Sequence, residues 1–339
     1  MDTPRLFATP DSGPFGRRQA RPRGARIPVI VVTGFLGAGK TTLIRHFLGT
    51  PEGRGTAIVV NEFGEAGIDD ALLRQSTEAV SLLGNGCVCC VVRSDLQLTL
   101  RALVADRTRG AIPGFARVVI ETSGLADPGP ILQSFATDRA LGDSFYIDAV
   151  ITVADAATGA ATLEAAAEAR KQVILADRIV VTKTDIADPL LTTALTERIR
   201  HLNPRAAIAT VINGQIDPGI LLEPAPSDRS PFVAEAEHSD GIGSFVLRAG
   251  GPLPWTTFAR AMDTLTALRG PDLLRVKGLL NVEGCQGPVL VEFVQHLAHL
   301  PVELQQWPEG SREGRLVFIT RNISEAQVRG LFAAVSALG

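Results

Sequence analysis

The stretch Gly34-Phe-Leu-Gly-Ala-Gly-Lys40-Thr41-Thr42 decides the fold of this chain of 339 residues. It has the spacing of a phosphate-binding P-loop. The apolar run Pro28-Val-Ile-Val-Val-Thr33 before it has the pattern of a buried strand, and residues 40–48 after it have the pattern of a helix. The sequence therefore predicts a strand, a glycine-rich turn and a helix that together bind a nucleoside phosphate.

Each of the key positions in this loop has a predicted task. Gly34, Gly37 and Gly39 let the backbone curl so that its N–H groups face phosphate oxygens. Lys40 is predicted to reach the β- and γ-phosphates, and the Thr41 hydroxyl is placed to ligate a magnesium ion. The predicted ligand is thus a nucleoside triphosphate with Mg2+.

The residues around the P-loop alternate between short β-branched runs and amphipathic stretches. Apolar runs without alternation indicate strands buried on both faces, and strand–helix alternation indicates a parallel sheet covered by helices. The predicted fold class is α/β, a doubly wound, mostly parallel sheet. We expect further strands at residues 56–61, 79–83, 117–121, 147–152, 178–182 and 206–212, and helices at residues 96–108, 130–141, 160–176 and 190–202.

Composition changes divide the chain into four predicted parts. Residues 1–26 are a basic tail without an apolar core, which we expect to be disordered rather than a secretory signal; a transit peptide or an anionic docking arm stays open. Residues 27–222 form the P-loop domain, and the Pro-rich residues 223–243 form a linker. Residues 244–339 form a smaller α+β domain. Its expected strands are 244–248, 273–280, 289–293 and 316–320, with helices at 256–268 and 324–338.

The bulk composition argues against two classes of partner. A net charge of −3 and an aromatic content of 5% give no reason to expect nucleic-acid binding. No apolar run reaches the roughly 18 residues that span a bilayer, so no membrane association is expected. Four cysteines without an export signal are best explained as reduced thiols in the cytoplasm.

Two further motifs follow predicted strands. Val118-Val-Ile-Glu121-Thr-Ser-Gly124 resembles a Walker B site, in which the Glu121 carboxylate orients magnesium or its water and Gly124 presents its N–H to the γ-phosphate. The alternative is a strand end with a surface glutamate. Val180-Val-Thr182-Lys183-Thr184-Asp185 resembles the guanine-reading motif Asn-Lys-x-Asp, with Thr182 in place of the usual Asn.

The proposed base reader is chemically specific. The Asp185 carboxylate can accept hydrogen bonds from both N1–H and the exocyclic amine of guanine, whereas adenine offers no such pair. The Lys183 stem can lie along the face of the base. GTP is therefore the expected nucleotide, and ATP stays open. Asn213-Gly214 is placed like a further loop that touches the base edge.

Three of the four cysteines lie close together in Gly86-Cys87-Val-Cys89-Cys90. Thiolates suit zinc, cobalt or copper(I). The chain has no partner Cys-x-x-Cys pair, so the thiolates are expected to form an open, exchangeable site completed by Glu62, Glu65 or water. These two glutamates could instead contact magnesium, position water or lie solvated. Inert buried cysteines and redox-sensing thiols are the alternatives.

The P-loop, the cysteine segment, the Glu121 motif and the Thr182–Asp185 motif follow one another along the chain. In this order they resemble the motifs of the CobW-like metallochaperone GTPases. The resemblance covers residues 27–337, including Arg275-Val-Lys-Gly278, Trp307-Pro308 and Val317-Phe-Ile-Thr-Arg321 near the C-terminus. Many family members carry a His-rich stretch between the domains, whereas this chain has the single His238 there.

The resemblance implies GTP hydrolysis coupled to delivery of Zn2+ or Co2+ to a client metalloenzyme. It assigns phosphate and magnesium binding to Gly37, Ala38, Gly39, Lys40, Thr41 and Thr42. It assigns base binding to Thr182, Lys183 and Asp185. The transition-metal ligands it implies are Cys87, Cys89 and Cys90, and Glu65 is the expected additional ligand. Lys40, Glu62 and Glu121 are the expected catalytic residues. Turnover is expected to be slow, because no arginine finger is evident and a client or a second copy could complete the site. A P-loop small-molecule kinase and a redox-regulated GTPase switch remain the alternatives.

Overall fold

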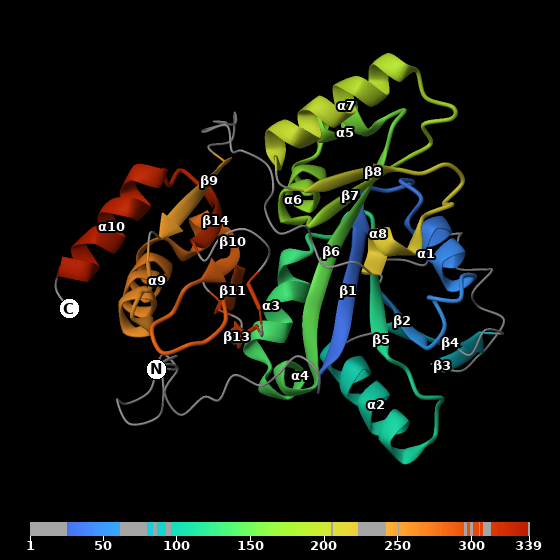
Figure 1. Ribbon diagram of the computed structural model, residues 1–339. Helices are drawn as coiled ribbons and strands as arrows, with labels where there is room; N and C mark the ends of the chain where they lie inside the picture. The colour runs from blue at the N-terminus through green and yellow to red at the C-terminus, as the bar shows by residue number, and fades with distance from the viewer. Residues whose placement is uncertain are drawn as a thin grey trace. The chain divides into compact units, whose positions relative to one another are not determined.

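Figure 1 shows the protein as a computed structural model. The structure describes residues 26–61, 80–83, 87–92, 96–204, 206–222, 242–249, 251–294, 297–298, 301–304, 306–307 and 313–337. The described residues divide into two compact units, one within residues 26–222 and one within residues 242–337. The predicted basic tail (but for Arg26) and residues 223–241 of the predicted linker lie outside the described residues, so the domain boundaries stay a prediction.

The first unit contains an eight-stranded sheet in the order β3-β4-β2-β5-β1-β6-β7-β8. All neighbouring strands are parallel except β3 and β4. This arrangement confirms the predicted α/β class with a mostly parallel sheet. The strands are β1 (Ile27–Gly34), β2 (Thr56–Asn61), β3 (Val80–Leu83), β4 (Cys87–Val92), β5 (Arg117–Thr122), β6 (Phe145–Asp155), β7 (Arg178–Thr182) and β8 (Ala207–Thr210).

Helices cover both faces of this sheet (Figure 1). On one face, α1 and α8 share a core with Ile30 and Val32 of β1. On the other, α3, α4 and α6 pack against β6. The helices are α1 (Lys40–Leu48), α2 (Leu96–Arg109), α3 (Gly129–Thr137), α4 (Arg139–Ser144), α5 (Gly159–Ala165), α6 (Ala167–Leu175), α7 (Pro189–Leu202) and α8 (Pro218–Leu222). Burial on both faces explains why the central strands, such as β1, β2 and β7, are nearly continuous apolar runs.

Two helices predicted as continuous are broken, so those predictions are wrong. The helix expected at residues 130–141 ends at Asp138, whose side chain accepts hydrogen bonds from the N–H groups of Ala140 and Leu141 and so starts α4. The helix expected at residues 160–176 is interrupted at Ala166, which has an extended backbone. A side chain that captures backbone N–H groups competes with the helix, and this explains the first break.

The second unit contains an antiparallel sheet of order β12-β11-β10-β14-β9, with β13 paired to β11. Its strands are β9 (Ile242–Ala249), β10 (Leu273–Leu280), β11 (Val289–Val294), β12 (Leu297–Ala298), β13 (Val302–Glu303) and β14 (Gly314–Arg321). Helices α9 (Trp255–Arg269) and α10 (Glu325–Ala337) pack on it around Phe258 and Val328. A capping box opens α10: Gln327 N–H donates to Ser324 Oγ, and Ser324 N–H donates to Gln327 Oε1.

The topology of the first sheet fixes where a ligand can bind. Strand β1 lies between β5 and β6. Strands β2 to β5 lie on one side of β1 and strands β6 to β8 on the other, so the direction of the strand order reverses at β1. Open α/β sheets bind ligands at such a switch point, outside the carboxyl ends of the strands. The loops after β1, β5, β6 and β7 meet at this edge, and they carry the predicted nucleotide motifs.

Candidate nucleotide site

The P-loop joins β1 to α1 through backbone conformations that only glycine adopts readily. Gly34 has a φ of +143° and Gly39 a φ of +97°. A Cβ atom on Gly34 would lie 2.2 Å from the carbonyl oxygen of Val153 in β6. The loop can therefore lie directly against β6 only because Gly34 has no side chain.

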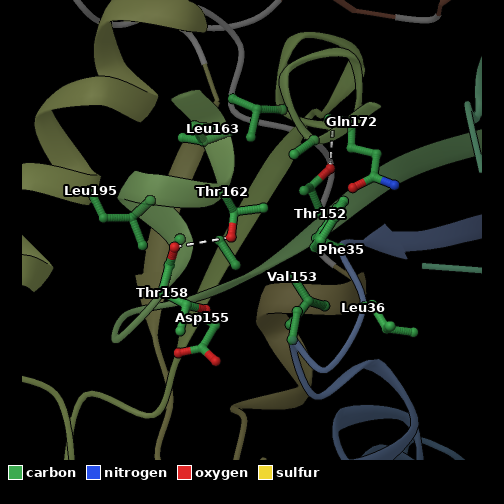
Figure 2. Close-up of a pocket in the computed structure, with 15 residues that line it drawn as sticks. Phe35, Leu36, Thr152, Val153, Asp155, Thr158, Thr162, Leu163, Gln172 and Leu195 are labelled. Carbon is green, nitrogen blue, oxygen red and sulfur yellow. Dashed lines mark hydrogen bonds between the residues drawn. The ribbon is translucent and has the colours of Figure 1, made fainter. Parts of the chain in front are cut away.

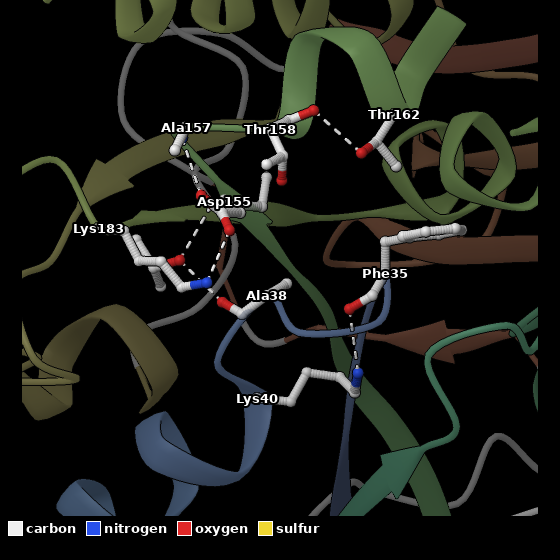
Figure 3. A network of polar contacts seen from close by, with 10 residues as sticks. Phe35, Ala38, Lys40, Asp155, Ala157, Thr158, Thr162 and Lys183 are labelled. Carbon is white, nitrogen blue, oxygen red and sulfur yellow. Dashed lines mark hydrogen bonds and ion pairs between the residues drawn. The ribbon is translucent and has the colours of Figure 1, made fainter. Parts of the chain in front are cut away.

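The Lys40 ammonium is held by carbonyls of the loop itself. Lys40 is 9% exposed, and its Nζ donates to the carbonyl oxygens of Gly34 at 2.9 Å and Phe35 at 3.3 Å; Figure 3 shows Lys40 beneath Phe35. A buried ammonium attracts an anion strongly, because the surroundings screen its charge weakly. The loop thus holds a positive charge where its N–H groups can also bind phosphate.

Thr41 and Glu121 come together although 80 residues separate them. The Thr41 hydroxyl donates to Glu121 Oε1 at 2.6 Å, and Glu121 is 7% exposed. The alternative of a surface glutamate at a strand end is therefore wrong. A hydroxyl and a carboxylate are hard oxygen ligands of the kind that Mg2+ prefers, so the pair fits that ion.

The loop after β5 lies against the P-loop. A Cβ atom on Gly124 would lie 2.7 Å from both the backbone nitrogen and the Cα atom of Leu36. On its other side, Gln172 of α6 donates to the carbonyl oxygens of Gly124 and Ala126. The segment predicted to sense the γ-phosphate is thus enclosed between the P-loop and α6.

The predicted base-reading motif follows β7, and its residues Thr182, Lys183 and Asp185 have different environments. The Thr182 hydroxyl lies 2.7 Å from the carbonyl oxygen of Ala38, to which it donates, so it ties β7 to the P-loop. Lys183 has a φ of +58°, and its ammonium lies 2.7 Å from Asp155 Oδ2 at the end of β6 (Figure 3). The Lys183 side chain is partly exposed but its ammonium is paired with Asp155, whereas Asp185 is an exposed residue.

The loop Asn213-Gly214 reaches the start of α1. Both residues have a positive φ, and a Cβ atom on Gly214 would lie 3.0 Å from Thr42 Cγ2 and 2.9 Å from His46 Cδ2. The loop predicted to touch the base edge therefore lies beside α1, where it approaches Thr42, two residues after Lys40. Its contact with a base stays a prediction.

The predicted transition-metal site is only partly within the described residues. The backbone of Cys87, Cys89 and Cys90 belongs to β4, which is parallel to β2, with Cys89 opposite Ile58. Glu62, Glu65 and the side chains of the three cysteines lie outside the described residues. Within the described parts of the chain, no group of three or more His, Cys, Asp and Glu residues could hold a metal ion.

Asp155 and Gln172 contribute to the site but were not predicted. The two carboxylate oxygens of Asp155 have different partners: Oδ1 accepts a hydrogen bond from Ala157 N–H in the turn after β6, and Oδ2 accepts one from the Lys183 ammonium. Its place directly after an apolar strand was a signal that could have found it. Gln172 lies within a helix, and nothing in the surrounding sequence marks it. Both line a cavity of about 360 Å³, including open solvent, beside Phe35 and Leu36 (Figure 2).

A P-loop and a buried acidic partner for Thr41 at the carboxyl ends of a parallel sheet define a P-loop nucleotide-binding domain. Family models match both units: the CobW/HypB/UreG nucleotide-binding domain over residues 28–210, and the cobalamin synthesis protein cobW C-terminal domain over residues 242–336. The chain belongs to the CobW family of P-loop GTPases.

Relatives match over nearly the whole chain. The zinc chaperone YjiA of Escherichia coli is 35% identical over 317 residues, covering 91% of this chain and 98% of YjiA. The zinc chaperone CobW of Pseudomonas aeruginosa is 32% identical, with 90% of each chain covered. The crystal structure of Zn(II)-bound YjiA GTPase from E. coli superimposes with a TM-score of 0.71 at 34% identity, covering 91% of this chain and 99% of that one. Among the described residues, no helix has the length and apolar character needed to cross a membrane.

Proposed function

We propose that this chain is a GTP-hydrolysing metallochaperone that carries Zn2+, or Co2+, on Cys87, Cys89 and Cys90 and delivers it to a client metalloenzyme. One observation carries the proposal: β4, whose backbone includes these cysteines, pairs with β2, and β2 pairs with β5, which carries Glu121. Two strand spacings are about 10 Å. Only β2 lies between β5, which carries Glu121, and β4, which carries the cysteines, so a shift of β5 on nucleotide hydrolysis can be transmitted to β4 through a single strand.

In the nucleotide half of the proposal, Lys40 and the N–H groups of residues 37–42 bind the phosphates. Thr41 and Glu121 would hold Mg2+, which supplies positive charge to offset the charge that develops on the phosphates. Asp185 reads guanine, while Asp155 keeps Lys183 in place beside the base. Glu62 is the candidate for positioning the attacking water.

In the metal half, two or three of the thiolates and the Glu65 carboxylate form an open site. Zinc is favoured over cobalt because similar full-length relatives are zinc chaperones. Both ions suit thiolates, and availability decides between them. By linkage, if GTP raises metal affinity, metal must raise GTP affinity by the same factor. We place the protein in the cytoplasm, with either the client or a second copy completing the hydrolytic site.

A competition titration tests the coupling. Zn2+ and Co2+ affinities are measured with GDP and with a non-hydrolysable GTP analogue, on wild type and on the double variant Cys87→Ser, Cys90→Ser. We expect tighter metal binding with the GTP analogue in wild type and weak, nucleotide-independent binding in the variant. Equal metal affinity in both nucleotide states would refute the chaperone coupling.

The same preparation separates the alternatives. A small-molecule kinase would consume nucleotide only when an acceptor is present. A redox switch would form a reversible disulfide that changes nucleotide affinity without any metal. Cys285→Ser is the matched control for the cysteine variants, since Cys285 lies in the second unit and is the cysteine that the described side chains show as a free thiol.

A further inference from the structure

The loop that follows β5 is held by two consecutive residues of α6. Gln172 Nε2 donates to the carbonyl oxygen of Gly124 at 3.2 Å and to that of Ala126 at 3.0 Å. The Lys171 ammonium lies 3.0 Å from Asp127 Oδ2. Residues 124–127 are thus held at three points from one side, while the Leu36 backbone presses on Gly124 from the other.

The orientation of the Gln172 amide is determined by its neighbours. Both of its partners are carbonyl oxygens, which only accept, so the NH2 end must face them. The two protons of that group are then both used. Gln172 is 1% exposed, so its amide has no solvent to replace these partners. Its own backbone carbonyl accepts from the Thr152 hydroxyl at 2.6 Å, which fixes α6 to β6 (Figure 2).

These bonds also set the direction of the N–H groups in the loop. In a trans peptide the C=O and N–H point in opposite directions. With the carbonyls of Gly124 and Ala126 turned toward α6, the N–H groups of Leu125 and Asp127 are turned away from it. The Gly124 N–H, which is predicted to face the γ-phosphate, belongs to the preceding peptide, whose Ser123 carbonyl accepts from Ala126 N–H at 3.1 Å. Hydrogen bonds therefore link the loop from Ser123 to Ala126, and Gln172 acts on the Gly124 N–H through them.

We propose that Gln172 is a positioning residue for GTP hydrolysis: through Gly124 and Ala126 it holds the loop after Glu121 in the conformation that contacts the γ-phosphate. This inference rests on the proposed function, because it requires GTP to be the substrate. It assigns to Gln172 no contact with the nucleotide. It predicts that losing the amide donors affects GTP and its hydrolysis but not GDP, which has no γ-phosphate.

The test is Gln172→Met, which keeps the length of the side chain but removes both donors. We expect kcat for GTP hydrolysis to fall about tenfold and the affinity for a non-hydrolysable GTP analogue to fall about fivefold to tenfold, the size of losing one or two neutral hydrogen bonds. GDP affinity should stay within about twofold of wild type. Stopped-flow binding of fluorescent nucleotides and phosphate release measure all three.

The matched control is Ile174→Ala, two residues further along α6. Ile174 is 1% exposed and does not line the cavity beside Phe35, so its truncation destabilises the same helix while the bonds of the Gln172 amide stay in place. We expect its Tm to fall while kcat and both affinities stay close to wild type. If Ile174→Ala reproduces the loss of kcat seen in Gln172→Met, Gln172 is only structural and the inference is overturned.

A second variant keeps the shape of the side chain and adds a pH readout. Gln172→Glu places a carboxylate against two carbonyl oxygens, and only its protonated form can donate one hydrogen bond. The ratio of kcat for Gln172→Glu to kcat for Gln172→Met should rise several-fold as the pH falls from about 8 to about 6, because burial favours the protonated form. A ratio that does not change with pH would contradict the donor role.

The outcomes separate this inference from the proposed function. If wild type binds and hydrolyses GTP but Gln172→Met weakens GTP and GDP equally, the positioning role is refuted and the GTPase proposal stands. If wild type does not hydrolyse GTP, the proposed function itself fails and the inference fails with it.

Discussion

At the phosphate end of the nucleotide site, the Lys40 ammonium and the Glu121 carboxylate are buried and hydrogen-bonded to the protein, whereas at the base end the Asp185 carboxylate is exposed. Between the two ends, Thr182 ties β7 to the P-loop and Asp155 holds Lys183. At the phosphate end, the charges of Lys40 and Glu121 are thus fixed in low-dielectric surroundings. At the base end, the charge of Asp185 lies on an exposed loop.

This difference indicates how binding energy and selectivity are divided. The fixed, weakly screened ammonium of Lys40 stabilises any nucleotide that carries phosphates, so removing that charge should weaken GTP, GDP and ATP alike. An exposed carboxylate gains most from a base with two matching donors, so changes there should alter the choice of base. The variants below test that division, from the largest expected effect to the smallest.

Lys40→Ala should have the largest effect. It removes the ammonium that the Gly34 and Phe35 carbonyls hold in the loop. We expect the affinity for GTP, GDP and ATP to fall together by about 100-fold to 1,000-fold, or roughly 3–4 kcal/mol, as for other buried charge contacts. Isothermal titration calorimetry measures it. Arg45→Ala, which removes one exposed positive charge from the same helix, is the control and should bind like wild type.

Asp185→Asn should change the preferred base rather than abolish binding. We expect GTP affinity to fall about 30-fold to 100-fold, the size of losing a charged hydrogen-bond pair. Xanthine has a carbonyl where guanine has its amine, so xanthosine triphosphate should bind the variant better than it binds wild type. Competition against a fluorescent nucleotide tests both.

Glu197→Gln is the matched control for Asp185→Asn, because it neutralises an exposed carboxylate on the helix that follows, α7. It should leave base preference unchanged. If Asp185→Asn lowers GTP and ATP affinity equally, Asp185 does not read guanine, and base selectivity does not lie at the Asp185 end of the site.

The elements that the sequence predicted well are those whose cause is local. The P-loop follows from nine consecutive residues. Strands β2, β7 and β10 were predicted with their observed bounds, and β2 and β7 are short apolar runs closed by polar residues. The breaks at Asp138 and Ala166 were missed, since neither position carries Pro or Gly. Asp138 acts through its side chain, which an average helix propensity does not represent.

The parts of the site that could not be predicted depend on contacts between distant segments. The Gln172 amide meets Gly124 across 48 residues and the Asp155 carboxylate meets Lys183 across 28. Predicting residues 160–176 as one helix also hid where Gln172 points. By contrast, Thr41 and Glu121, 80 residues apart, could be paired, because each belongs to a motif whose chemistry requires the same magnesium ion.

Gly124→Ala tests the contact between the loop after β5 and the P-loop. The added Cβ would lie 2.7 Å from backbone atoms of Leu36, which cannot rotate away as a side chain can. We expect about 2 kcal/mol of destabilisation, seen in chemical denaturation, and weaker binding of GTP and GDP alike because the P-loop must shift. Gly330→Ala in α10 is the control: no atom lies within 4 Å of its Cβ, so it should stabilise slightly.

Thr182→Val should have the smallest effect, and it decides to which end Thr182 belongs. The variant keeps the shape of the side chain but leaves the Ala38 carbonyl without its donor at 2.7 Å. We expect a loss of about 1 kcal/mol, or roughly fivefold in affinity, for GTP and ATP equally. Thr182→Ser keeps the hydroxyl and should bind close to wild type.

This pair of variants separates position in a motif from physical role. In the sequence, Thr182 occupies the first place of the base-reading motif, but its hydroxyl bonds to the P-loop. An equal loss for GTP and ATP in Thr182→Val would assign it to the phosphate end, since a P-loop contact does not distinguish bases. A loss confined to GTP would instead show that the hydroxyl acts on guanine selectivity, and the boundary between the two ends would move to include it.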